Sequence, residues 1–432
     1  MVIAWFNAVM ALPCAILFLM IAIIISYKMK WIQFWGFGRF VSLIVHGFEV
    51  QENQNEKNGT INGFHALFAA MATAIGTGSI VAPSLAIIAG GPGALLWLII
   101  YLFFGSVLKY VEVVLALRTR ATDHVNAVVG GPMHYLTLVH PWLAWWYGFV
   151  MLLLYFFGWQ TVQANTLAAI FSQESVHPLI VGIVLGVLLY SILQGGARLV
   201  GRVASYLVPI MFLLYIAFAL AILKNYSHLL LETCWLIFSD AFSLRSCAGS
   251  LCAIGFLQGV QAGVYRGIFI SEAGLGTSSI AHAVSDVKNP KDQGILALYS
   301  TLADIILSVI SGFLILVTKV WVSQTSLKAT LIYEVFKQES PGFGQYMLLV
   351  SISLFVFTTI LGNGFNGLQI YKYFTSSSYV QFYIVLVSMI VCCATLLPVP
   401  VVWQIQDVLL TFAIVPHICG LFLIFCRHRN WF

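Results

Sequence analysis

The stretch ATAIGTGSIVAPS, residues 72–84, lies inside an apolar run, 64–89, that is long enough to cross a membrane. Glycine and proline are poor helix formers, so Gly76, Gly78 and Pro83 within one stretch predict a break in that helix. Backbone groups without a helical partner are costly in lipid unless something binds them. The stretch therefore predicts an unwound segment that serves as a binding site.

The composition of the whole chain is that of a membrane protein. Of the 432 residues, 61% are hydrophobic and 8% are charged, and the mean hydropathy is +0.96. A soluble domain carries about 25% charged residues, which excludes a soluble protein. The apolar runs are continuous and do not alternate with polar residues, so they predict helices and not the strands of a barrel. We expect an all-α integral membrane protein with about eleven transmembrane helices, at 8–27, 64–89, 93–117, 142–171, 178–194, 203–223, 246–270, 294–318, 345–372, 378–397 and 402–426.

The distribution of basic residues predicts the topology. If the N-terminus is outside, fourteen of the 20 Lys and Arg fall in cytoplasmic segments. This bias follows the positive-inside rule and predicts an external N-terminus, a cytoplasmic C-terminus and a multi-pass protein of the plasma membrane, the inner membrane in a bacterium. Two outer segments, 224–245 and 325–340, are expected to be amphipathic or surface connectors. The net charge of +5 thus reflects contact with the lipid bilayer and not a nucleic-acid partner.

The order of the spans predicts an inverted repeat. With 1–63 set aside as an extra helix and linker, 64–223 and 246–432 form two groups of five helices joined by the connector 224–245. Because five is odd, the second group enters the membrane from the opposite side. The first span of the second group, 246–270, is also rich in glycine, and interrupted helices at matching places of two inverted halves indicate a transporter's binding site. Glycines four residues apart equally suit close helix packing, and this alternative remains open for 246–270.

A helix broken at the middle of the membrane has a definite chemistry. Free N–H groups attract an anion, and free carbonyls attract a cation. One unwound stretch can hold a carboxylate and a sodium ion, which suits a small zwitterion carried with Na⁺. The chain has no cluster of residues with catalytic or metal-binding spacing. We therefore expect a transporter, not an enzyme, with sodium as a co-transported ion and no organic cofactor.

Several motifs resemble the alanine/glycine:cation symporter family, the sodium:alanine symporters of the amino acid-polyamine-organocation superfamily. They are FHALFAAMATAIGTGSIVAPSLAIIAGG from residue 64, GGPMHYL (130–136), TVQANTLA (161–168), GGARLVGRVASYLVPIMFLLY (195–215), GVYRGIFISEAGLGTSSIAHA (263–283) and VFTTILGN (356–363). The resemblance covers nearly the whole chain. It implies a LeuT-type 5+5 inverted repeat with one extra N-terminal helix, and sodium-coupled uptake of alanine or glycine, with D-alanine as a further candidate.

The resemblance also implies roles for individual residues. Backbone N–H groups around Thr77 and Gly78 would bind the substrate carboxylate. The sodium ligands would be carbonyls near Thr73, Ala74 and Ile75 and the hydroxyls of Thr358 and Thr359. Gln163 and Asn165 match a polar pair of the family, of which one is expected to contact the amino acid and the other to brace the bundle. On the glycine-rich span, Gln258 or Gln261 is expected to face the substrate.

Three positions depart from the family pattern. Ser79 and Ser271 stand where the family usually has Asn, and Asn363 stands where it usually has a bulky aromatic residue. Ser79 has a shorter reach than Asn, which weakens a second cation site. Asn363 widens or polarises the substrate pocket, which relaxes selectivity for alanine and glycine. These changes leave open a membrane sensor that no longer transports. A proton-coupled carrier of the same fold, with Asp304 carrying the proton, is the nearest alternative.

The ionisable residues inside the spans are candidates for gating or coupling. Lys109 and Glu112 are three residues apart on one helix and are expected to form a structural ion pair, with a role in the inner gate as the alternative. Asp304 is an isolated acid that serves the cation path, a proton relay or a structural hydrogen bond. Glu272 is expected to organise an inner loop together with Arg266.

Overall fold

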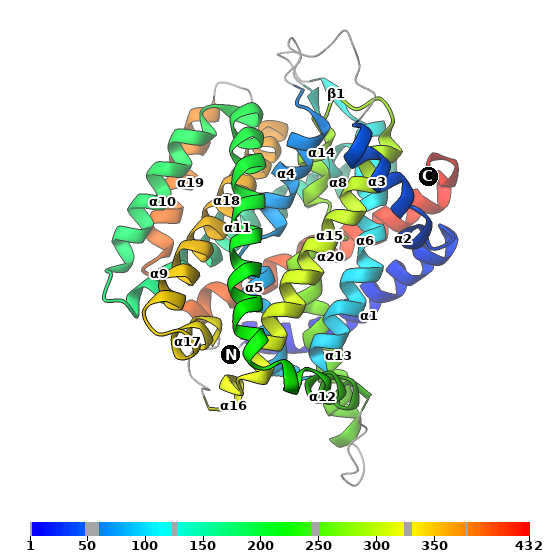
Figure 1. The fold of residues 1–432 in the computed structure, drawn as a ribbon. Helices are drawn as coiled ribbons and strands as arrows, with labels where there is room; N and C mark the ends of the chain where they lie inside the picture. Colours follow the sequence, from blue (N-terminus) through cyan, green and yellow to red (C-terminus); the bar gives the residue numbers. More distant parts are fainter. Residues whose placement is uncertain (1, 48–59, 123–127, 243–250, 324–330, 376–378) are drawn as a thin grey trace.

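The computed structural model describes residues 2–47, 60–122, 128–242, 251–323, 331–375 and 379–432. Within these ranges the chain is a bundle of helices, with one antiparallel pair of short strands, β1 (Ala121–Thr122) and β2 (Val128–Val129) (Figure 1). Three basic residues of the topology prediction, Lys57, Arg245 and Lys328, lie outside the described residues. The predicted boundary between residues 245 and 246 lies outside them too.

Each predicted span coincides with a helix or with two helices in series. The long elements are α1 (Val2–Lys28), α4 (Gly63–Ala74) and α5 (Thr77–Gly90), α6 (Ala94–Arg118), α8 (Pro141–Leu154) and α9 (Gln160–Ser172), α10 (Pro178–Leu193), α11 (Gly196–Asn225), α13 (Leu251–Ser271) and α14 (Thr277–Ala283), α15 (Pro290–Val317), α18 (Phe343–Phe374), α19 (Val380–Ala394) and α20 (Val399–Arg427). In the described part of the chain, 8 helical stretches are long and apolar enough to cross a membrane, and α10 and α19 are shorter apolar helices. The multi-pass, all-α architecture is confirmed.

Short elements join the long ones. They are α2 (Ile32–Trp35), α3 (Phe37–His46), α7 (Pro132–Tyr135), η1 (Leu136–Leu138), the π-helical turn η2 (Tyr155–Trp159), η3 (Ser227–Leu229), α12 (Leu230–Phe242), α16 (Val320–Ser323), α17 (Leu331–Glu339) and η6 (Arg429–Trp431). In Figure 1, α12, α16 and α17 lie at one end of the bundle, and β1 and α14 lie toward the other. The predicted connectors 224–245 and 325–340 contain α12 and α17, so both lie at the same end.

The first broken helix is where the glycine-rich stretch predicts it. Helix α4 ends at Ala74 and α5 begins at Thr77, so only Ile75 and Gly76 are unwound. A Cβ on Gly76 would lie 2.3 Å from the hydroxyl oxygen of Thr359 in α18. Glycine is therefore required for the close approach of α18 to the break.

The second broken helix corrects the sequence prediction. The span 246–270 was expected to be interrupted by its glycines, but α13 runs unbroken from Leu251 to Ser271. The chain instead unwinds over Glu272–Gly276 before α14 begins at Thr277. Gly274 and Gly276 have φ angles of 83° and 80°, which glycine adopts at low cost.

Gly263 and Gly267 of α13 serve helix packing, which is the alternative that the sequence left open. A Cβ on Gly263 would lie 2.3 Å from the carbonyl oxygen of Ala94 in α6. One on Gly267 would lie 2.9 Å from the ring of Tyr101. A helix with small residues every fourth position lets a neighbouring backbone approach closely, so these glycines seat α13 on α6 without unwinding it. Gly249 of this span lies outside the described residues.

Candidate functional site

The first turn of α5 forms the positive end of the site. The side chains of Thr77 and Ser79 are fully buried. The N–H groups of this turn have no partner within their own helix. The side-chain oxygen of Gln163 in α9 accepts hydrogen bonds from the Thr77 N–H, at 3.2 Å, and from the Thr77 hydroxyl, at 2.7 Å. An acceptor oxygen therefore lies at the N-terminus of α5, where a carboxylate is also favoured by the helix dipole.

The end of α4 forms the negative side of the site. The hydroxyl of Thr359 donates to the carbonyl of Ile75 at 3.2 Å. Thr358, the next residue, donates to carbonyls of its own helix and contacts the sulfur of Met211 at 3.3 Å. Of the two threonines predicted as sodium ligands, Thr359 reaches the break and Thr358 faces α11. The carbonyl of Ala74 accepts the N–H of residue 76 at 3.0 Å.

Glu272 lies beside the break and not in an inner loop. Its carboxylate accepts hydrogen bonds from the hydroxyls of Thr73, at 3.2 Å, and of Thr277. The side chain thus links the ends of α4 and α14. The expected contact with Arg266 is wrong, because α13 continues past Arg266 for five residues and carries Glu272 about 9 Å further along the helix axis. Arg266 instead pairs with Asp407 of α20, at 3.3 Å.

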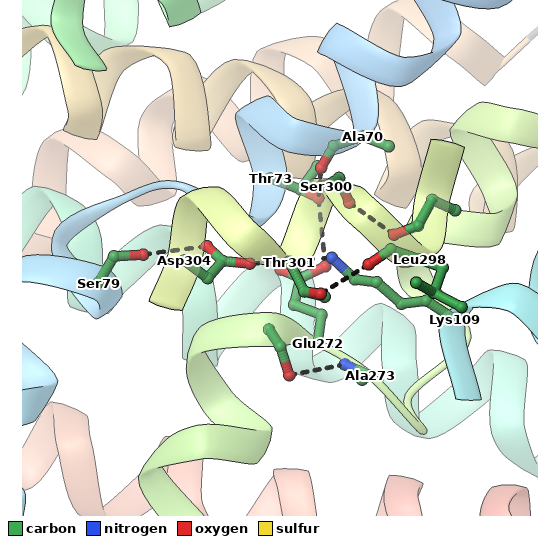
Figure 2. A network of polar contacts seen from close by, with 12 residues as sticks. Ala70, Thr73, Ser79, Lys109, Glu272, Ala273, Leu298, Ser300, Thr301 and Asp304 are labelled. Atoms are coloured by element: carbon green, nitrogen blue, oxygen red, sulfur yellow. Dashed lines mark hydrogen bonds and ion pairs between the residues drawn. The ribbon is translucent and has the colours of Figure 1, made fainter. Parts of the chain in front are cut away.

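The pairing of Lys109 also corrects the sequence prediction. Its ammonium nitrogen lies 4.0 Å from a carboxylate oxygen of Asp304 in α15, and both side chains are buried (Figure 2). The other carboxylate oxygen of Asp304 accepts from the hydroxyl of Ser79 at 3.2 Å. Glu112 accepts the N–H of Gly276 at 3.0 Å. Lys109 and Glu112 therefore bind different elements, α15 and the second break respectively.

Side chains bind three successive carbonyls of the second break. Ala273, Gly274 and Leu275 accept from Tyr101, His417 and Tyr147, at 2.8, 2.7 and 2.5 Å respectively. The bond to Gly274 requires a proton on Nδ1 of His417, since a carbonyl oxygen only accepts. In the neutral ring, Nε2 then accepts from the hydroxyl of Tyr135, at 2.6 Å. Ser271 caps the end of α13, because its hydroxyl donates to a carbonyl of its own helix and accepts the N–H of Ala273.

A stack of side chains covers the site on the side of α20. The ring of Phe269 lies 3.1 Å from where a Cβ on Gly78 would be. Trp403 packs edge-on against Phe269, with ring centroids 5.4 Å apart. The guanidinium of Arg266 lies 5.2 Å from the Trp403 ring while it pairs with Asp407. These side chains cover the first turn of α5 on this side.

Two further predicted residues lie away from the break. Gln261 lines a pocket of about 420 Å³ together with Arg266 and Asp407. It is ten residues before the end of α13, about 15 Å along the axis. Asn165 donates to the carbonyls of Ala394, at 3.1 Å, and Leu397, at 2.6 Å, at the end of α19. Its amide nitrogen therefore joins α9 to α19.

Asn363 lies on the face of α18 that is turned toward both breaks. Thr359 and Asn366 are on the same face, and Asn366 donates to the carbonyl of Thr277 at 3.1 Å. Asn363 is fully buried. Neither its side-chain nitrogen nor its oxygen has a hydrogen-bond partner among the described residues.

The comparisons with known proteins agree with this architecture. The profile described as sodium:alanine symporter family matches residues 1–429. The chain belongs to the sodium:alanine symporter family. It is 30% identical over 385 residues to the sodium/alanine symporter AgcS of Methanococcus maripaludis, covering 86% of this chain and 84% of the relative. It is 26% identical over 414 residues to the "Probable sodium/glutamine symporter GlnT" of Bacillus subtilis, covering 95% and 84%.

The fold is that of the LeuT-type transporters. The structure of MhsT in complex with L-phenylalanine superposes with a TM-score of 0.61 at 14% identity, over 85% of this chain and 89% of that one. Membership of the sodium:alanine symporter family makes the chain a membrane transporter of amino acids and not an enzyme.

Sequence reasoning missed Trp403 and Asp407 of α20, which cover the site. It also did not single out Gln406 of α20 or Trp159 of the π-helical turn, whose buried polar atoms lack partners in the described structure. Trp403, Gln406 and Asp407 are more than 120 residues away from the second break and belong to no motif. An acid within the predicted span 402–426 was the available signal for Asp407. Trp159 gives no such signal, because an aromatic residue in an apolar span is ordinary.

Proposed function

We propose that this protein carries a neutral amino acid together with sodium. The observation that supports the proposal is the two-residue break at Ile75 and Gly76, where the ends of α4 and α5 face each other. Thr359 binds the carbonyl of Ile75 on one side of this break, and Gln163 binds Thr77 on the other side. Opposed helix ends of this kind suit the two charges of a zwitterion and a cation at the middle of the membrane.

The proposed sites follow from the polarity of the helix ends. Sodium binds to the carbonyls near Thr73, Ala74 and Ile75 with the hydroxyl of Thr359, since a hard cation prefers oxygen ligands. The amino acid's carboxylate binds to the N–H groups of Gly78 and Thr77, which requires the oxygen of Gln163 to leave the Thr77 N–H. Alanine and glycine are the smallest amino acids with such a carboxylate. The relatives' names assign alanine to AgcS and glutamine to GlnT.

Transport requires that the two sides of the site open in turn. We propose that Arg266, Asp407 and Trp403 close the outer side and that Glu272, bound to Thr73 and Thr277, closes the inner side. The groups 64–223 and 246–432 then rock against each other, with the N-terminus outside and the C-terminus in the cytoplasm. Sodium and the amino acid shift the balance between the outward-open and inward-open states only if they bind these two states with different affinity.

Uptake into proteoliposomes tests the proposal. Radiolabelled L-alanine, D-alanine and glycine are supplied under an inward sodium gradient and, separately, under a proton gradient alone. Sodium-driven uptake of alanine or glycine is the expected result. Uptake driven only by a proton gradient would keep the assignment as an amino acid carrier but make the proton the coupled ion, with Asp304 as the expected proton site. A folded protein that takes up no neutral amino acid would favour a sensor.

A further inference from the structure

Asn363 lies between the two unwound segments. Thr359, Asn363 and Asn366 are spaced by four and three residues, so they share one face of α18. On one side of Asn363, Thr359 binds the carbonyl of Ile75 in the first break. On the other side, Asn366 binds the carbonyl of Thr277 at the start of α14. The side chain of Asn363 therefore faces the space where the two broken helices meet.

The amide of Asn363 is buried without a partner. Its exposed fraction is 0%, and both of its polar atoms lack a hydrogen bond within the described residues. Buried polar groups are nearly always paired, because an unpaired amide costs about 1–3 kcal/mol. An amide in this position is suited to a ligand that offers both a donor and an acceptor.

Trp159 and Gln406 are among the other side chains with unpaired polar atoms on these helices. The indole nitrogen of Trp159 and both amide atoms of Gln406 are buried and lack partners in the described structure. Trp159 ends the π-helical turn η2, one turn before Gln163, which binds Thr77. Single π-helical turns of this kind occur frequently at functional sites.

The π-helical turn brings these groups together. Elements α18 and α20 both pack against η2. The Cγ atom of Gln406 lies 3.5 Å from where a Cβ on Gly158 would be. Elements α18 and α20 thus meet at this turn, and α18, α20 and η2 each carry buried donors or acceptors without a partner in the described structure.

We propose that these groups recognise a carboxamide side chain, so that glutamine or asparagine is carried in preference to alanine. This inference rests on the proposed function, because it needs the carboxylate at Thr77 and Gly78. A carboxamide offers an oxygen to the indole N–H of Trp159 and both a donor and an acceptor to Asn363. The methyl group of alanine leaves these atoms unpaired, and a site built from hydrogen-bonding groups discriminates against ligands that lack them.

Competition in proteoliposomes tests the preference. Unlabelled glutamine, asparagine, alanine, glycine and glutamate compete with sodium-driven uptake of radiolabelled alanine. Glutamine or asparagine is expected to inhibit at a concentration about tenfold below that of alanine, as one net hydrogen bond would produce. Glutamate, of similar size but charged, is expected to inhibit weakly.

Substitution of Asn363 locates the preference. Asn363→Leu keeps the side-chain size and removes both polar atoms, so the ratio between the inhibitory concentrations of alanine and of glutamine should fall from about tenfold to about one. Trp159→Phe removes only the indole N–H and should reduce the advantage about threefold. Ser351→Ala is the matched control: its hydroxyl bonds to Met347 in its own helix, about 18 Å along α18 from Asn363, and it should change nothing.

The outcomes separate the two proposals. If glutamine and asparagine inhibit sodium-driven alanine uptake no better than unlabelled alanine does, the inference is overturned and the proposed function is kept. An Asn363→Leu protein that loses alanine and glutamine uptake equally would also overturn it. Absence of sodium-driven uptake of every neutral amino acid would overturn the proposed function. Thermal unfolding of the purified wild-type protein gives a reading that needs no variant: glutamine should raise the midpoint at lower concentration than alanine.

Discussion

The two broken helices differ in what binds their unwound backbone. The second break extends over Glu272–Gly276, and side chains bind three of its carbonyls and the N–H of Gly276. The first break is two residues long, and in the described structure side chains bind the carbonyl of Ile75 and the N–H of Thr77. The longer break is thus held by several side chains of the protein, and side chains bind two backbone groups around the shorter one.

Glu272 connects these two regions. Its backbone has a φ angle of 54°, which is unusual for a residue other than glycine. Strain of this kind persists where the surrounding structure stabilises it, and here the hydroxyls of Thr73 and Thr277 bind the carboxylate. A change at the first break can therefore reach α14 through one side chain.

The largest expected effect comes from the buried ion pair behind the first break. Lys109→Met keeps the length of the side chain and leaves Asp304 buried without its cation, which should lower the free energy of unfolding by about 3–5 kcal/mol. The unfolding midpoint in detergent measures this loss. The double variant Lys109→Met/Asp304→Asn should recover most of it, because neither charge then remains. A single variant as stable as the wild type would show that the pair contributes nothing.

Gly76→Ala should disrupt the first break. The added Cβ would lie 2.3 Å from the hydroxyl oxygen of Thr359, so α18 must move away from the break. We expect sodium-driven uptake to fall about 100-fold, which corresponds to about 2.7 kcal/mol and lies within the range for overpacking. Gly255→Ala is the control, because no atom lies within 4 Å of the added Cβ. Uptake within twofold of the wild type for Gly76→Ala would mean that this approach is not required.

Thr359→Val and Thr358→Val separate two neighbouring hydroxyls. Only Thr359 reaches the Ile75 carbonyl, so its loss should raise the KM for sodium about tenfold, as expected for one ligand, with the maximal rate nearly retained. Thr358 bonds to its own helix, and its loss should change that KM less than threefold. Uptake measured against sodium concentration distinguishes the two variants. The reverse order would place sodium on the side of α11.

Tyr147→Phe should give the smallest effect. It removes one of the three donors to the second break and should lower stability by about 1 kcal/mol, the usual net contribution of one hydrogen bond. The KM for sodium should stay within twofold of the wild-type value, because the second break is held by side chains and is not proposed to bind sodium. The unfolding midpoint and the KM for sodium are measured on the same preparation. A large change in KM with unchanged stability would make the second break part of the cation site.

The first break was predictable because its cause is local. Gly76, Gly78 and Pro83 within one apolar run are poor helix formers wherever the run is placed, and the membrane makes free backbone groups costly. The second break was misplaced because glycine has two uses. Gly263 and Gly267 of α13 permit close packing on α6, whereas Gly274 and Gly276, in SEAGLG, adopt positive φ angles and end the helix.

Apolar run length, glycine placement and family motifs are properties of the chain itself. They determine the membrane class and the position of the first break, and they predict a repeat of two five-helix groups. The partners of Lys109, Glu112 and Arg266 and the unpaired groups around Asn363 depend on the packing of helices. Lys109 and Asp304 are 195 residues apart, and helical spacing specifies only which face a side chain occupies, not which helix meets that face. Tertiary packing alone decides that choice, since burial selects neighbours by shape and polarity across the whole bundle.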